Sequence, residues 1–154
     1  MALELSDEIL ISASRDRVYA ALQDAAILQQ CIPGCEELIQ HSPTDLEAKV
    51  VLKIGPVKAR SGGKVTLDTA GAPAGFTLRG EGSGGVAGFA KGGAAVTLED
   101  LGTDTMLRYT ASADVGGQIA QPGSRLIFGT ARTLAGNFFA TFAEVVKVQE
   151  AGAE

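Results

Sequence analysis

The chain has 154 residues, 45% of them hydrophobic, and a formal net charge of −5, which fits one soluble globular domain with an ordinary core. Its Lys and Arg residues are thinly spread, which argues against nonspecific nucleic-acid binding because that requires clustered cations. The amino terminus lacks the basic and apolar regions of a signal peptide, and no apolar run reaches membrane-spanning length. We therefore expect a cytoplasmic protein.

The first third of the chain predicts a strand followed by two short helices. From Leu3 to Ile11 apolar and polar residues alternate, which is the period of a half-buried strand, and Asp7 falls on the otherwise apolar side. Ser14 is a good helix N-cap, and apolar residues then recur at helical spacing until Pro33-Gly34. We predict that this helical segment is broken near Asp24.

Strand-like alternation dominates the middle of the chain. It resumes after Cys35 and predicts one long strand from Leu46 to Ala59, interrupted at Gly55-Pro56. Further strands are predicted at residues 64–69, 75–80, 90–99 and 105–115, with turns at 71–73 and 100–102. The spacing favours antiparallel pairing throughout.

From Pro122 onward the apolar period becomes helical. Two adjacent rows of large side chains, one containing Phe138 and the other Phe139, predict a long amphipathic helix that lies on the sheet. Residues 149–154 are predicted to fray. The expected single domain therefore comprises residues 1–148.

The stretch from Arg79 to Gly93 imitates a dinucleotide-binding loop. Gly80, Gly82 and Gly85 satisfy the G-x-G-x-x-G spacing after a predicted strand. That motif functions only where a helix begins at the third glycine, and the glycines that follow here disfavour a helix. We interpret the stretch as a glycine-rich turn between two antiparallel strands.

Cys31 and Cys35 have one other soft metal ligand within reach along the chain, His41. Three ligands do not complete a structural zinc site, and the C-x3-C spacing fits two reduced thiols near a Pro-Gly turn. No catalytic Ser-His-Asp or Cys-His pattern is present in the sequence. We predict no metal site and no catalytic residue.

This order of elements predicts an α+β helix-grip fold, in which a curved antiparallel sheet of about seven strands wraps a long carboxy-terminal helix. Large Phe residues on that helix would face small strand residues such as Ala48 and Ala111. Such a pairing fits either an interlocked core or an apolar ligand cavity. The sequence leaves both open.

Five short motifs follow one another along the chain. They are Cys31-Ile-Pro-Gly-Cys-Glu36, Ile54-Gly-Pro-Val-Lys-Ala59, Gly80-Glu-Gly-Ser-Gly-Gly85, Gly88-Phe-Ala-Lys-Gly92 and Gly116-Gly-Gln-Ile-Ala-Gln-Pro-Gly-Ser-Arg-Leu-Ile127. Together they resemble the CoxG family of carbon monoxide dehydrogenase subunits, within the START-like, polyketide-cyclase-related superfamily. The resemblance covers nearly the whole chain.

The resemblance implies a non-catalytic accessory protein that works with a molybdenum hydroxylase of the carbon monoxide dehydrogenase type. It also implies that the protein binds a hydrophobic ligand, quinone or lipid, and helps bring the enzyme to the cytoplasmic membrane. Many relatives continue into a hydrophobic carboxy-terminal segment, whereas this sequence ends at Glu154. We therefore expect any membrane contact to be peripheral or indirect.

Strand parity and helix phase give a predicted ligand site. Its residues are Leu107, Tyr109, Phe128, Ala131, Phe138, Phe89, Lys91 and Gln118. An isoprenoid or acyl tail would lie against Leu107, Tyr109, Phe128 and Phe138, with Ala131 on the same inner face. Polar contacts near the mouth would come from Tyr109, Lys91 or Gln118. We expect no cofactor other than such a bound quinone or lipid.

Two alternatives remain from the sequence. An enzyme of the cyclase or hydratase type would need an acid–base pair in the hollow, with Asp7, Tyr109, Arg79 and Lys91 as the candidates. A protein-interaction adaptor with a filled core would present the glycine-rich turn at 80–93 and the segment 116–121 to a partner.

Overall fold

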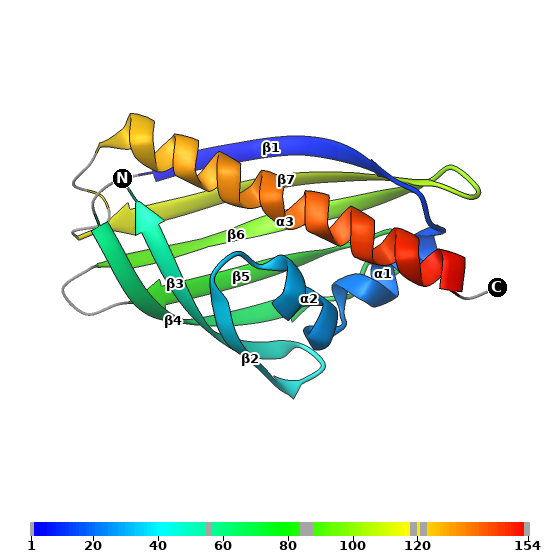
Figure 1. Cartoon of the computed structure of the whole chain (residues 1–154), viewed down its shortest axis with the longest axis horizontal. Helices are drawn as coiled ribbons and strands as arrows, with labels where there is room; N and C mark the ends of the chain where they lie inside the picture. Colours follow the sequence, from blue (N-terminus) through cyan, green and yellow to red (C-terminus); the bar gives the residue numbers. More distant parts are fainter. Residues whose placement is uncertain (1, 55–56, 84–87, 118–119, 121–122, 153–154) are drawn as a thin grey trace.

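The computed structural model describes residues 2–54, 57–83, 88–117, 120 and 123–152. Its elements follow in the order β1 (Ala2–Ile11), α1 (Arg15–Leu22), α2 (Ala25–Cys31), β2 (Cys35–Ser42), β3 (Asp45–Ile54), β4 (Val57–Asp68), β5 (Gly75–Ser83), β6 (Phe89–Asp100), β7 (Thr105–Gly116) and α3 (Ser124–Gly152). The strands form one seven-stranded antiparallel sheet in the order β1-β7-β6-β5-β4-β3-β2. Figure 1 shows α3 running along the curved sheet. The predicted helix-grip fold is confirmed.

The two short helices begin where the sequence predicts, because each has a side-chain cap. The Ser14 hydroxyl accepts the backbone N–H of Arg17 at 3.4 Å and starts α1. The Asp24 carboxylate accepts the N–H of Ala26 at 2.9 Å and starts α2. These bonds satisfy helix N–H groups that have no partner within the helix. Asp24 therefore both separates the two helices and begins the second.

The long strand predicted from Leu46 to Ala59 is wrong, because the structure divides it between two strands. β3 ends at Ile54 and β4 begins at Val57, and these two residues pair across the hairpin. β4 then continues without a break to Asp68. The interior pair Gly62-Gly63 interrupts the apolar alternation and conceals this continuity in the sequence.

The glycine-rich stretch was predicted to be a turn, but its described glycines lie mainly inside two paired antiparallel strands. Gly80 and Gly82 belong to β5 and pair with Gly92 and Ala90 of β6. Gly85 lies outside the described residues. No helix begins in the described residues 88–117, which follow the glycine motif. The motif therefore lacks the helix that dinucleotide binding requires.

The largest fully buried apolar side chains belong to one end of the molecule, where α1 and the carboxy-terminal part of α3 lie over the sheet (Figure 1). Ile11, Val18, Leu107, Phe142 and Val146 are all fully buried there in one apolar cluster. We call these five residues the packed end. The long helix supplies two of them, as its predicted amphipathic pattern requires.

The helix α3 extends through Gly152. Helical backbone therefore continues beyond residue 149, where the sequence predicts fraying. Ile127 and Phe142 are buried on one side of α3, whereas Asn137 and Glu144 are exposed on the other. This difference confirms that the helix is amphipathic along its described length.

Candidate functional site

A partly open cavity of about 340 Å³ lies between α3 and the concave face of the sheet. Every strand contributes to its lining, together with all three helices. Four alanines, Ala48, Ala94, Ala111 and Ala135, leave space in this lining. Small residues opposite aromatic ones therefore produce a hollow here rather than an interlocked core.

The cavity wall is almost wholly apolar. Among its described lining residues, Tyr109 is the only one with a polar side-chain atom; the others carry hydrocarbon side chains. Such a wall repels water and charge and accommodates aliphatic chains or rings. The volume falls within the range of small-molecule sites, about 300–1,000 Å³.

Aromatic rings of α3 form one side of the cavity. The Phe139 ring stacks on Tyr109 with centroids 4.7 Å apart and planes 19° apart. Phe138 meets Phe139 edge to face at 4.9 Å. Both arrangements are favourable ring geometries, worth about 0.5–1.5 kcal/mol beyond the area that they bury. They hold the wall in a defined shape.

Tyr109 is the titratable side chain in this lining. Burial raises its pKa, the nearby Asp7 carboxylate raises it further, and Arg132 opposes the rise. The phenol therefore stays protonated at neutral pH and can donate a hydrogen bond. Asp7 itself is exposed, and its Oδ1 accepts the backbone N–H of Glu8 at 2.8 Å.

Two of the predicted ligand residues, Tyr109 and Phe138, line the cavity. Leu107 faces the same side of the sheet, but it is fully buried in the packed end and does not line the hollow. Ala131 lies one helical turn before the lining residue Ala135. Of the residues predicted on β7 and α3, Tyr109 and Phe138 therefore border the cavity, whereas Leu107 and Ala131 lie beyond its lining.

The structure places Phe128, Phe89 and Lys91 away from the cavity. Phe128 is 40% exposed, since ten residues separate it from Phe138 and turn it about 80° around the helix. Phe89 is 47% exposed, and Lys91 lies on the outer face of the sheet. Gln118 lies outside the described residues.

Arg79, a candidate for the enzymatic alternative, also lies on the outer face. It lines a shallow depression there together with Lys64 and Lys91. Strand parity explains the placement, because Leu78 of the same strand lines the cavity and successive side chains point to opposite faces. Arg79 and Lys91 therefore cannot act inside the hollow.

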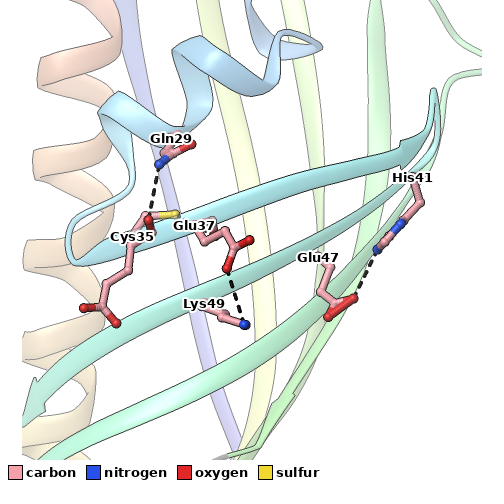
Figure 2. Close-up of polar contacts among 7 residues, drawn as sticks. Gln29, Cys35, Glu37, His41, Glu47 and Lys49 are labelled. Carbon is pink, nitrogen blue, oxygen red and sulfur yellow. Dashed lines mark hydrogen bonds and ion pairs between the residues drawn. The ribbon is translucent and has the colours of Figure 1, made fainter.

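The candidate metal ligands lie apart. Figure 2 shows Cys35 and His41 near opposite ends of β2, with the His41 Nε2 atom 3.1 Å from a Glu47 carboxylate oxygen. Cys31 is buried in the core at the end of α2. Burial raises the pKa of both thiols, and a backbone hydrogen bond at Glu37 partly offsets the rise at Cys35. Both thiols therefore remain protonated and poorly reactive at neutral pH.

Sequence reasoning missed several lining residues, notably Phe139, Ala135, the α2 residue Leu28 and the residue that follows α2, Ile32. The second apolar row of the long helix already contained Ala135 and Phe139, so a signal for them existed. No sequence signal indicated the contribution of α2, because periodicity does not reveal which helix packs over a sheet. The wall is therefore broader than predicted.

The model of the CoxG protein family, whose members are described as a subunit of carbon monoxide dehydrogenase, matches residues 8–147. A conserved protein from Geobacillus kaustophilus is 28% identical, with a TM-score of 0.87, over 94% of this chain and 95% of that one. No curated protein sequence matches the chain.

More distant solved structures share the fold. The ZhuI aromatase/cyclase from Streptomyces sp. R1128 is 12% identical, with a TM-score of 0.70, over 96% of this chain and 94% of that one. A START superfamily protein from Mycobacterium smegmatis is 14% identical, with a TM-score of 0.67, over 98% and 99% of the two chains. The described helices include none that is both long and apolar enough to cross a membrane.

Proposed function

The chain belongs to the CoxG family of carbon monoxide dehydrogenase subunits, and we propose that it is a non-catalytic accessory protein of a molybdenum hydroxylase of that type. In this role it binds a hydrophobic ligand, a quinone or a lipid, in the cavity. It also helps to bring the enzyme to the membrane surface. The cavity is the observation that carries the proposal.

The chemistry of the wall supports a ligand with a large apolar part. About 340 Å³ of hollow surrounded by hydrocarbon side chains is unfavourable to leave empty, because its lining atoms lose packing contacts. An isoprenoid or acyl chain would restore those contacts without needing a polar partner. A hydrophilic substrate would lose its hydration and gain almost no hydrogen bonds.

The same wall supports a non-catalytic role. General acid–base catalysis needs a donor and an acceptor within reach of the reacting atoms. In the described lining, Tyr109 is the single side chain that can transfer a proton. Arg79 and Lys91 lie on the outer face of the sheet, so neither can complete a pair with it.

Exposed apolar side chains support contact with the membrane. Phe89, Leu126 and Phe128 are each at least 40% exposed, and they belong to the start of β6 and the start of α3, at the same end of the molecule (Figure 1). The cations Lys91 and Arg125 lie beside them in the sequence. Apolar and cationic side chains together favour a peripheral position on anionic lipid.

A filled cavity tests the ligand-binding proposal. In Ala135→Trp the indole would occupy the hollow, so we expect binding of a decyl-substituted benzoquinone to weaken at least tenfold, as measured by isothermal titration calorimetry. Ala131→Trp, one turn away and outside the lining, is the matched control. Equal affinity in Ala135→Trp and in the unmodified protein would place the ligand elsewhere.

One observation favours the enzymatic alternative. Asp7 and Tyr109 are direct partners in the β1–β7 register, which brings a carboxylate near the only hydroxyl of the described cavity wall. A cyclase or hydratase would use them as base and acid. Turnover of a cyclic ketone or thioester that disappears in Asp7→Asn would establish this activity and displace the accessory role.

The adaptor alternative is tested separately on the glycine-rich turn. Phe89 is exposed at the start of β6, where a docking partner would cover it. Loss of co-purification with the hydroxylase in Phe89→Asp would locate the docking surface at this turn. Retained association would exclude the turn as that surface.

A further inference from the structure

The cavity wall meets charged groups at one place, beside Tyr109. The phenol belongs to the lining, and Asp7 is its direct partner on the neighbouring strand. Because β1 is an edge strand of the sheet, the Asp7 side chain lies at the border between the wall and solvent, and it is exposed. The hydroxyl is therefore close to a route out of the hollow.

Arg132 approaches the same place from α3. Ala135 and Phe139, three and seven residues later, share its side of the helix, and both line the cavity. Phe139 in turn stacks on Tyr109. Arg132 therefore lies on the cavity-facing side of the helix, one turn beyond the lining, and it is exposed to solvent.

The charged groups of Asp7 and Arg132 do not stabilise the fold through ion pairs with the described residues. In the described part of the chain, neither Asp7 nor Arg132 forms an ion pair, and the Asp7 carboxylate accepts only the N–H of its neighbour Glu8. Each charge influences the Tyr109 phenol, in opposite directions. Donors and an acceptor thus converge where the apolar wall ends.

We propose that Tyr109, Arg132 and Asp7 form a polar gate that binds the uncharged carbonyl head of the ligand, while its tail occupies the cavity. The proposal rests on the ligand-binding role proposed above. The Tyr109 hydroxyl and the Arg132 guanidinium donate to the carbonyl oxygen. The Asp7 carboxylate disfavours an anionic head by repulsion.

The charge balance of the gate selects a neutral head. One carboxylate and one guanidinium together carry no net charge, and the described wall behind them contains no cation to hold a carboxylate group. A fatty acid anion would keep an uncompensated charge near an apolar wall, which is costly. A quinone or an acyl ester keeps only dipoles there, and both present the carbonyl that the gate requires.

Titration calorimetry with matched probes tests the gate. The probes are a decyl-substituted benzoquinone, methyl decanoate, decanoic acid and decylbenzene, which has the tail and ring but no carbonyl. Tyr109→Phe removes one hydroxyl and keeps the stacked ring, with Tyr19→Phe as control because Tyr19 lies outside the cavity lining. Arg132→Gln is paired with Lys147→Gln, another exposed cation of α3.

We expect Tyr109→Phe and Arg132→Gln each to weaken the carbonyl probes about tenfold, the size of one hydrogen bond, and to leave decylbenzene unchanged. Decanoic acid should bind the unmodified protein more weakly than its methyl ester. If the two variants weaken the benzoquinone more than methyl decanoate, the natural ligand is a quinone. If they weaken methyl decanoate more, it is an ester.

The outcomes separate the two proposals. If decylbenzene binds but neither gate variant changes the affinity for a carbonyl probe, the gate is wrong and the cavity role stands. Equal losses for decylbenzene and the carbonyl probes also contradict the gate, since they indicate a damaged wall. If no probe binds the unmodified protein, both proposals fail.

Discussion

The packed end and the cavity use the same sheet and the same long helix, yet one is solid and the other hollow. At the packed end, Leu107 of β7 and Phe142 of α3 are fully buried. A short distance along the same two elements, Ala111 and Ala135 line the cavity. The comparison teaches that side-chain size at inward positions, rather than the course of the backbone, determines where this fold has space.

Removing an aromatic ring should give the largest difference in stability between the packed end and the cavity wall. Phe142→Ala leaves a void in the packed end, and we expect a loss of about 3–5 kcal/mol in the free energy of unfolding, measured with urea. Phe138→Ala, at the cavity wall, should cost roughly half as much because part of its ring already faces empty space. Equal losses would contradict the distinction.

Adding a side chain sharpens the same comparison. Ala21 of α1 is only 3% exposed in the packed core, so Ala21→Leu should cost about 1–3 kcal/mol through overpacking. Ala111→Leu projects into the hollow, and we expect thermal stability in the absence of ligand to remain unchanged or to rise. A large loss in Ala111→Leu would mean that the cavity is already filled.

The smallest expected effect concerns pH. Burial and Asp7 raise the Tyr109 pKa in the folded state, so the unfolded chain releases this proton first. The resulting stability is present below about pH 10, the usual tyrosine pKa, and is lost as the pH rises through the folded value. Tyr109→Phe should lose less stability than the unmodified protein between neutral and strongly alkaline pH in urea titrations; identical slopes would contradict this linkage.

Most of the fold was predictable because short sequence patterns determine its strands and helix starts. Alternating residues identified the strands, and Ser14 and Asp24 marked the starts of the two short helices. The continuity of β4 from Val57 to Asp68 was missed because Gly62 and Gly63 have no side chains to carry the alternation. Strand pairing there depends on partners that are distant in the sequence.

The candidate site was only partly predictable. Periodicity assigned the correct side to Tyr109 and Phe138, but it could not tell that Leu107 belongs to the packed end or that the cavity stops short of Ala131. Whether a given position on a strand or helix borders the cavity depends on the side chains that pack against it from distant parts of the sequence. The link to a molybdenum hydroxylase came from the family motifs, because a fold of this kind serves several functions.

Mass spectrometry of an organic extract tests ligand binding most directly. The protein would be purified from its native host without detergent and extracted, with a sample of the Ala135→Trp variant treated in parallel. We predict a quinone or lipid with a carbonyl head in a stoichiometric amount in the unmodified protein, and its loss from the variant. An extract that contains no hydrophobic molecule, or equal amounts from both proteins, would contradict a ligand-binding cavity.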